Sequence, residues 1–277
     1  MSKIKQAIIS VSDKNKLEIV LKILKKFNIK IISSGGTCKK IRKLGYKCNE
    51  VSNFTNSSEI LEGRVKTLHP KIHAGILNKR NNKFHRKQMK LNKYENIDLV
   101  IVNFYPFEKT VSKTKDHKFI IENIDIGGPT LARAAAKNFN DVAVITNIDQ
   151  YNELIDELQK NNGSTSLNFR QKLSVEAFSQ TSYYDSMVTN YFTSKTKNKF
   201  PKRKLIYGNL IEKLRYGENP HQEAAIYSLD ESLNIVQLHG KKLSYNNYND
   251  LYSALNLSKT LPRNFGTVIV KHGNPCG

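Results

Sequence analysis

Short apolar runs alternate with helical patterns along the first half of the chain. Four of these runs predict buried strands, at residues 7–11, 29–33, 98–103 and 142–145. After the first run, apolar residues recur at helical spacing at Leu17, Val20, Leu21, Leu24 and Phe27. Strands that alternate with helices are typical of a parallel sheet with crossover helices, so this pattern predicts an α/β fold.

Three further helices are predicted in this half. A basic helix occupies residues 38–44, and a longer helical stretch covers about residues 167–192. Between them, we expect Asp149 to cap a helix that Gly163 ends, because these residue types favour the two helix termini.

The pattern fails over residues 193–204, which are polar, basic and aperiodic and therefore predict an exposed linker. Beyond it we expect strands near 223–227, 234–238 and 267–271 and a helix near 249–261. The predicted organisation is a domain at 1–194, a linker at 195–204 and a second α/β unit at 205–277. This unit is small for a stable domain and its last strand has no crossover, so we expect C-terminal truncation.

The composition is that of a folded, water-soluble chain. Of the 277 residues, 39% are hydrophobic and 25% charged, which excludes wholesale disorder although the mean hydropathy is −0.52. No apolar run approaches the length of a membrane span, and the N-terminus has no secretory core. Three cysteines without CxxC spacing give no disulfide framework, so a reducing cytoplasm is expected.

The net charge is strongly positive, with 45 Lys and Arg against 24 acidic residues. Phosphate neutralisation by such an excess is one route to nucleic-acid binding. The alternative is a general drift toward lysine, which we favour because no basic stripe interleaves with aromatic residues and no groove-reading motif is present. We therefore expect neither nucleic acid nor membrane among the partners.

Three turns have the residues of an anion site. They cover residues 10–14, 34–37 and 125–130, and each is predicted to lead into a helix. Helix N-termini present free N–H groups and partial positive charge, and glycine lets the backbone approach a phosphate. Capping alone explains any one of them, but three on the carboxyl edge of one sheet favour a ligand site.

Residues 63–70 crowd two cations, a hydroxyl and a histidine into a stretch that Pro70 keeps from being a helix interior. Arg64 and Lys66 could clamp a phosphate or a developing oxyanion, or could simply belong to a solvated basic loop. His69 and His73 have the i, i+4 spacing of a zinc helix, but Pro70 lies between them and no third ligand is suitably spaced. No metal site is predicted.

Several other segments carry polar groups in turns. An aromatic cluster at 103–107 follows a predicted buried strand, and Lys137 lies on the helix that starts near Gly128. In the second unit, residues 214–222 form a donor-rich loop, and the Lys271–His272 pair at a strand end could supply a general base with an electrostatic partner. Cys276, behind a proline in a turn, is interpreted as incidental.

Together these segments resemble the bifunctional purine biosynthesis family, AICAR transformylase/IMP cyclohydrolase, from Ile9 to the last residue. The motifs that carry the resemblance are SVSDK (10–14), SSGGT (33–37), GRVKTLHPKIHAGIL (63–77), NFYPF (103–107), ENIDIGGPTLARAAAKN (122–138), LRYGENPHQ (214–222), LSYNNYND (243–250) and VKHGNPCG (270–277).

The resemblance implies a methylglyoxal-synthase-like cyclohydrolase domain followed by an incomplete transformylase domain of cytidine-deaminase-like architecture. The first would close the formylated imidazole carboxamide ribotide (FAICAR) to IMP without a metal or cofactor. The second would transfer a formyl group from 10-formyltetrahydrofolate to AICAR, an activity that we do not expect from this chain alone. The family also implies a homodimer.

Site residues follow from the same resemblance. The nucleotide would be held by Ser10, Ser12, Lys14, Ser34, Gly35, Gly36, Thr37, Arg64, Thr67, Asn103, Gly127 and Gly128. Ring closure would use Lys66 as oxyanion stabiliser and Asp125, Tyr105 and Lys137 as a proton relay. In the second unit Lys271 and His272 would be catalytic, and Arg215, Tyr216 and His221 would hold AICAR.

The chain departs from the family at residues 56–59, where Asn-Ser-Ser-Glu replaces the usual Gly-Phe-Pro-Glu. Other hypotheses remain beside the enzyme. A related fold binds phosphorylated effectors without catalysis, the basic charge leaves RNA binding open, and a decaying remnant would fold poorly because its second unit exposes a sheet edge.

Overall fold

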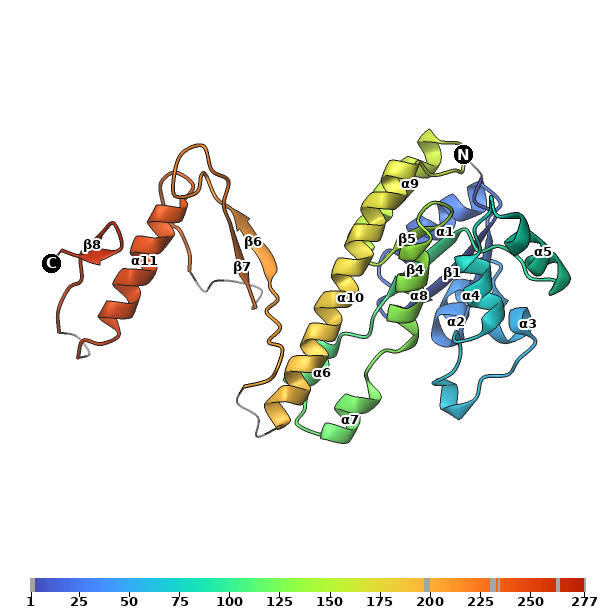
Figure 1. Cartoon of the computed structure of the whole chain (residues 1–277), viewed down its shortest axis with the longest axis horizontal. Helices are drawn as coiled ribbons and strands as arrows, with labels where there is room; N and C mark the ends of the chain where they lie inside the picture. The colour runs from blue at the N-terminus through green and yellow to red at the C-terminus, as the bar shows by residue number, and fades with distance from the viewer. Residues whose placement is uncertain (1–2, 197–199, 230–232, 234, 263–264, 277) are drawn as a thin grey trace. The chain divides into compact units, whose positions relative to one another are not determined.

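A parallel five-stranded sheet organises the first part of the chain in the computed structural model (Figure 1). The structure describes residues 3–196, 200–229, 233, 235–262 and 265–276. In spatial order, the strands are β3 (Asn49–Glu50), β2 (Lys30–Ser33), β1 (Gln6–Val11), β4 (Leu99–Asn103) and β5 (Ala143–Ile145). The two central strands β1 and β4 are buried along almost their whole length, as their apolar runs require.

Helices connect these strands. They are α1 (Leu17–Lys26), α2 (Gly35–Lys43), α3 (Val51–Thr55), α4 (Pro70–Leu77), α5 (Lys83–Leu91), α6 (Phe107–Lys113), α7 (His117–Glu122), α8 (Gly127–Lys137), α9 (Tyr151–Lys160) and α10 (Leu167–Lys195). Short 3₁₀ turns occupy Leu61–Gly63 and Ile148–Gln150.

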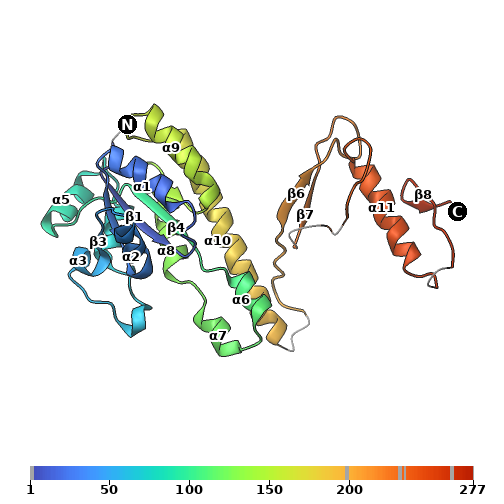
Figure 2. The same cartoon turned by 180° about the vertical axis from the view of Figure 1, so that it is seen from behind.

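The sheet is covered on both faces. Helix α8 packs on β4 and β5, and α10 runs along α8 and β5. Figure 1 shows α8 and α10 on one face, and the view from behind in Figure 2 shows α1 on the other. The α/β prediction and all four predicted strands are therefore confirmed, each within one residue at either end.

Helix boundaries differ from the predictions at two starts. Helix α2 begins at Gly35 rather than at residue 38, because the glycines after β2 already turn into the helix. Asp149 is not the cap of α9, whose N-cap is Gln150; Asp149 lies within the preceding 3₁₀ turn, which Asn147 caps. The two-residue strand β3 and the short helices α3 to α7 were not predicted, since their apolar repeats are too short to stand out.

The chain divides into two compact units, Met1–Pro201 and Lys202–Gly277. This division lies inside the segment predicted as a linker, although α10 extends through Lys195 and residues 197–199 lie outside the described residues. No helix among the described residues is long and apolar enough to cross a membrane.

The described residues of the second unit form two antiparallel strand pairs and one helix. The strands are β6 (Asn209–Lys213) with β7 (Ala225–Ser228) and β8 (Val270–Lys271) with β9 (Asn274–Pro275), and the helix is α11 (Tyr245–Ser258). The predicted strand at 234–238 is wrong for residues 235–238, which have no regular structure, and residue 234 lies outside the described residues. The helix predicted at 249–261 starts earlier, because Ser244 caps it and accepts a hydrogen bond from the Asn247 N–H.

Candidate functional site

The carboxyl ends of β2, β1 and β4 lie side by side at one edge of the sheet. Strand register places Val11 of β1 opposite Asn103 of β4, and Ile9 opposite Ser33 of β2. The turns after these strands, which include the predicted anion sites at 10–14 and 34–37, therefore share one edge of the sheet. Ligands collect at this edge in open α/β folds.

Asn103 fixes the turn after β1. Its Oδ1 accepts hydrogen bonds from the backbone N–H groups of Ser12 and Asp13 at 2.6 and 2.9 Å, and its Nδ2 donates to the Asp13 carbonyl at 2.9 Å. Lys14 closes the same turn, since its Nζ donates to the Ser12 carbonyl at 3.0 Å. Asn103 therefore shapes the turn that carries Ser12 and Lys14, whereas Ser10 lies within β1.

Thr37 ties the start of α2 to the end of β1. Its Oγ1 donates to the Val11 carbonyl at 2.9 Å and accepts from the Val11 N–H at 3.3 Å. Ser34 is the N-cap of α2 but makes no side-chain hydrogen bond to the helix. The first turn of α2, which includes Gly35 and Gly36, thus offers amide groups that are suited to an anion.

Lys66 extends to this helix start. A Cβ at Gly63, where φ is +89°, would lie 2.2 Å from Lys66 Cε, and a Cβ at Gly35 would lie 3.2 Å from Lys66 Nζ. The Lys66 side chain therefore lies between two glycines whose missing side chains make room for it. Its amine also pairs with Glu59, with 3.5 Å between Nζ and Oε2.

Thr67, the residue after Lys66, connects the same loop to α8. A Cβ at Gly127 would lie 2.9 Å from the Oγ1 of the buried Thr67. Residues 63–67, which we call the bridging loop, thus contact the first turns of both α2 and α8. The sequence prediction grouped these segments only by their motifs.

Asp125 lies just before α8. Its Oδ1 accepts from the Gly128 N–H at 2.8 Å, and its Oδ2 accepts from the Tyr105 N–H at 3.3 Å. Burial raises the pKa of the Asp125 carboxyl, and the amide hydrogen bonds partly oppose that shift. Gly128 is required here, because a Cβ would lie 2.6 Å from Asp125 Oδ2. The Tyr105 side chain itself is 50% exposed.

Arg64 lies in the bridging loop, but its side chain pairs with Glu122. Its Nε donates to Glu122 Oε1 at 3.1 Å, and its Nη2 donates to Glu122 Oε2. The hydrogen bonds of this exposed pair raise the pKa of Arg64 and lower that of Glu122. Phosphate binding by Arg64 would require it to exchange Glu122 for the ligand.

Lys137 is not brought to this group. It is the last residue of α8, ten residues after Gly127, which places its backbone about 15 Å further along the helix axis. Because α8 returns the chain to the start of the parallel strand β5, this end of α8 lies at the amino edge of the sheet. The third member of the predicted relay, Lys137, thus lies at the opposite end of α8 from Asp125, and its role in the relay stays a prediction.

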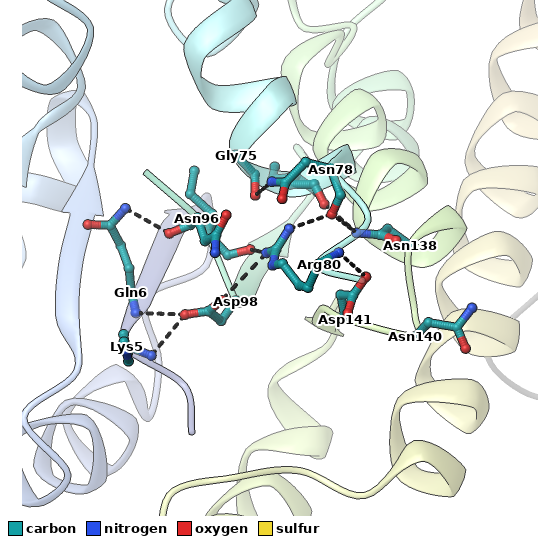
Figure 3. A network of polar contacts seen from close by, with 12 residues as sticks. Lys5, Gln6, Gly75, Asn78, Arg80, Asn96, Asp98, Asn138, Asn140 and Asp141 are labelled. Carbon is teal, nitrogen blue, oxygen red and sulfur yellow. Dashed lines mark hydrogen bonds and ion pairs between the residues drawn. The ribbon is translucent and has the colours of Figure 1, made fainter. Parts of the chain in front are cut away.

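Polar contacts connect several segments at that opposite edge (Figure 3). Asn138, directly after Lys137, donates to the Asn78 carbonyl at 3.0 Å. Arg80 donates to the same carbonyl at 2.6 Å and pairs with Asp98 at 3.5 Å. These contacts tie the ends of α4 and α8 to the start of β4, so they serve the fold at a distance from the bridging loop.

His69 and His73 follow the bridging loop, the first at the N-cap of α4 and the second within that helix. His69 caps α4, because its Nδ1 accepts from the Lys71 N–H at 3.1 Å, and Pro70 follows as the first residue of that helix. Burial lowers the pKa of His73. Within the described ranges, no group of three or more His, Cys, Asp or Glu side chains could hold a metal ion.

In the second unit, the segments 214–222 and 270–276 contact the first half of α11. The Tyr216 carbonyl accepts from the Tyr245 N–H at 3.1 Å, and the Gly273 N–H donates to Asp250 Oδ1 at 2.7 Å. The Arg215 guanidinium lies 4.9 Å from the ring centroid of Tyr216.

The remaining candidates of this unit are exposed to solvent. Lys271 ends β8, and His272 follows with a left-handed φ of 53°. His221 lies exposed in the loop of residues 217–222, which belongs to no strand or helix.

Sequence reasoning missed two residues at the first site. Glu59 pairs with Lys66, and it is the one residue of segment 56–59 that matches the family's Gly-Phe-Pro-Glu. Tyr184 lies on α10, and its hydroxyl oxygen accepts a hydrogen bond from the Asp125 N–H at 2.8 Å. Its only sequence signal is its place on a long helix, since no local motif surrounds it.

The arrangement combines an amine, a carboxylate of raised pKa and two helix N-termini. The amine and the helix amides can hold anionic oxygens, and a carboxylate whose pKa is raised is a better proton acceptor than an ordinary aspartate. Such a site suits a phosphorylated substrate that undergoes proton transfer.

Two protein-family models match the chain. The model for the MGS-like domain matches residues 16–130, and the model for the AICARFT/IMPCHase bienzyme matches residues 135–277. The first match covers β2, β3, β4 and the start of α8, and the second begins inside α8 and continues through the second unit.

Curated relatives match nearly the whole chain. The "Bifunctional purine biosynthesis protein PurH" of Bradyrhizobium diazoefficiens is 44% identical, over 99% of this chain and 53% of the relative. The protein of the same name from Persephonella marina is 46% identical, over 99% of this chain and 54% of the relative. The chain therefore spans about half the length of these relatives.

A solved structure is also similar. "Crystal structure of ForH" aligns with a TM-score of 0.61 and 28% identity, over 68% of this chain and 99% of that chain. Since the bienzyme model matches more than half of the residues, the chain belongs to the AICARFT/IMPCHase bienzyme family.

Proposed function

We propose that the first unit closes FAICAR to IMP, the cyclohydrolase step of purine biosynthesis. The observation that carries this proposal is the bridging loop, which puts Lys66 against the start of α2 and Thr67 against the start of α8. One loop thereby joins an anion site to the partly buried carboxylate of Asp125.

The ribotide phosphate is proposed to bind at the start of α2. The supporting groups are the first-turn amides at residues 35–37, the Lys66 amine and the turn at 10–14. Thr37 and Asn103 support this binding indirectly, because their side chains already hold the turn after β1. Phosphate would compete with Glu59 for Lys66 and with Glu122 for Arg64.

Ring closure is proposed to use Asp125. The carboxamide nitrogen attacks the formyl carbon, which forms a C–N bond and puts negative charge on the former carbonyl oxygen. Asp125 would accept the proton from that nitrogen, and the Lys66 amine would stabilise the oxyanion. The oxygen then takes up the proton that Asp125 accepted and leaves as water with a second proton from the former formamide nitrogen, as the C=N bond of the aromatic product forms. The exposed Tyr105 hydroxyl is proposed to exchange these protons. The cyclohydrolase step needs no redox cofactor.

The test is turnover of FAICAR, followed by the absorbance of IMP. Lys66→Ala and Asp125→Asn should each lower kcat by about 100-fold or more, as expected when one charged group at a developing charge is removed. Lys113→Ala, on the exposed end of α6, is the matched control and should retain full turnover. A folded wild-type chain that binds IMP without turnover would instead indicate a phosphorylated-effector module.

For the second unit we propose a part in formyl transfer from 10-formyltetrahydrofolate to AICAR. Tyr248 is the only large apolar side chain that is buried among the described residues after Lys202, whereas Ile206, Val236 and Leu238 are more than three-quarters exposed. This supports a transformylase site that these residues do not complete. The chain alone should therefore produce no FAICAR from AICAR and the folate.

We also propose a homodimer in the cytoplasm that binds neither nucleic acid nor membrane. The exposed apolar side chains of the second unit favour association with a second copy, and three free cysteines suit a reducing compartment. Light scattering should give twice the mass of one chain. Oligonucleotide binding that IMP fails to displace would contradict the partner assignment.

A further inference from the structure

Tyr184 belongs to a small aromatic cluster beneath the site. Its ring centroid lies 5.4 Å from that of Phe104 and 6.1 Å from that of Phe107, both in edge-on geometry, and the side chain is 2% exposed. These two phenylalanines flank Tyr105, whose amide donates to Asp125. The ring therefore holds the segment that supplies one of the carboxylate's hydrogen bonds.

The hydroxyl of Tyr184 holds Asp125 directly. It accepts from the Asp125 N–H at 2.8 Å, while the carboxylate of Asp125 accepts from Gly128 and Tyr105. Burial raises the pKa of Tyr184 to about 12, so the phenol is neutral across the range in which enzymes work. Three hydrogen bonds, one at the backbone N–H and two at the carboxylate, thus hold Asp125 in place.

We infer that Tyr184 is a positioning residue for ring closure, which holds Asp125 in place through the Asp125 backbone amide and the segment 104–107. This inference rests on the proposed function. Tyr184 lies on α10 and far along the chain from every motif of the site. Its effect should fall on the chemical step, because the proposed phosphate site at α2 involves other residues.

Tyr191 provides the matched control. It lies two turns further along α10 in the same cluster, with its ring 5.8 Å from that of Phe107. Its hydroxyl contacts His117 Nδ1 at 2.8 Å rather than the site. Tyr191→Phe therefore removes a hydroxyl of the same kind from the same cluster without releasing Asp125.

The experiment measures kcat and KM for FAICAR in the full chain with Tyr184→Phe and with Tyr191→Phe. Tyr184→Phe should lower kcat about tenfold with KM within about twofold, since one hydrogen bond to the Asp125 backbone is lost while the ring stays. Tyr191→Phe should leave both constants within about twofold. Equal effects of the two variants, or a change confined to KM, would overturn the inference.

Amide hydrogen exchange gives a readout that does not depend on turnover. Exchange at residues 125–128 should accelerate in Tyr184→Phe and stay unchanged in Tyr191→Phe; equal exchange would also refute the positioning role. Asp125→Asn separates the two hypotheses. If it abolishes turnover while Tyr184→Phe behaves as wild type, only the positioning role fails, and if it leaves turnover intact, the proposed function fails.

Discussion

At the residue scale, the site depends on a carboxylate held partly out of water. Asp125 accepts two amide hydrogen bonds, yet burial dominates and raises its pKa above the ordinary 3.8. An ordinary surface aspartate is a weak base at neutral pH, and a raised pKa makes proton transfer to it more favourable. The same burial means that the ionised form opposes folding.

The pH dependence of turnover should show this shift. Ionised Asp125 is the proposed base, and its population falls as the pH drops through the raised pKa. The acid limb of kcat/KM should therefore lie at a higher pH than an unperturbed aspartate would give. A pH–rate profile checks this, and an acid limb at the pKa of a solvent-exposed aspartate would contradict the role of burial.

Asp125→Asn should separate chemistry from stability. A folded-state pKa above the unfolded value means that ionisation lowers stability at every pH above the folded pKa. The neutral amide escapes this cost and keeps an acceptor for the Gly128 N–H, but it loses the acceptor for the Tyr105 N–H. Urea unfolding at neutral pH should therefore show a free energy within about 1 kcal/mol of that of wild type, although turnover is lost.

Lys137 provides the contrasting case among the residues suggested by the family motifs. Its position at the far end of α8 predicts that Lys137→Ala lowers kcat by less than about fivefold, whereas Lys66→Ala costs about 100-fold. Parallel FAICAR assays of the two variants test this. A loss at Lys137 as large as that at Lys66, with an unchanged melting temperature, would show that the amine reaches the reacting atoms.

At the element scale, the bridging loop depends on glycine at position 63 for two separate reasons. Gly63 has φ of +89° and directly abuts Lys66, whereas Gly45 has φ of +81° and a Cβ added there would meet no heavy atom within 4 Å. The two positions therefore share backbone strain but not proximity to the site. Substitutions at the two positions therefore separate the effect of backbone strain from the effect of displacing Lys66.

Gly63→Ala and Gly45→Ala should destabilise the protein similarly, by about 1–2 kcal/mol, because each forces an L-residue into the left-handed region. Only Gly63→Ala should also abolish most turnover, since its Cβ would displace the Lys66 side chain. Urea unfolding and FAICAR assays on both variants check these outcomes. Equal turnover in the two variants would show that displacing the Lys66 side chain does not affect activity.

Sequence patterns predicted the strands of the first unit well and the short helices between them poorly. The central strands are continuous apolar runs that are buried from both faces, so their burial is visible in the sequence. The segment 104–124 forms α6 and α7, whose apolar residues pack with Tyr184 and Tyr191 of α10. That packing partner is about 70 residues away in the sequence, and local periodicity cannot reveal it.

At the scale of the whole molecule, the two units differ in how much apolar surface they bury. Almost all buried apolar side chains lie in the first unit, around the sheet and its covering helices. The described part of the second unit buries little besides Tyr248. The first unit should therefore carry the cooperative unfolding transition.

Limited proteolysis tests this division. Lys202, Arg203 and Lys204 are exposed directly after the first unit, so a low dose of trypsin should cleave there first. The resulting fragment of about 200 residues should retain FAICAR closure, because every group of the proposed site precedes the cut. Loss of turnover at the rate of this first cleavage would show that the second unit supports the site.

The sequence by itself determined the alternation of strands and helices, the two-part organisation and the motifs that point to the family. These are local patterns, or sets of motifs that each lie within a few residues. Only the tertiary structure decided that Lys66 and Thr67 meet two different helix starts, that Tyr184 holds Asp125, and that Lys137 lies at the other edge of the sheet. The reason is that helix direction and strand order set which distant residues meet, and neither is written in any one motif.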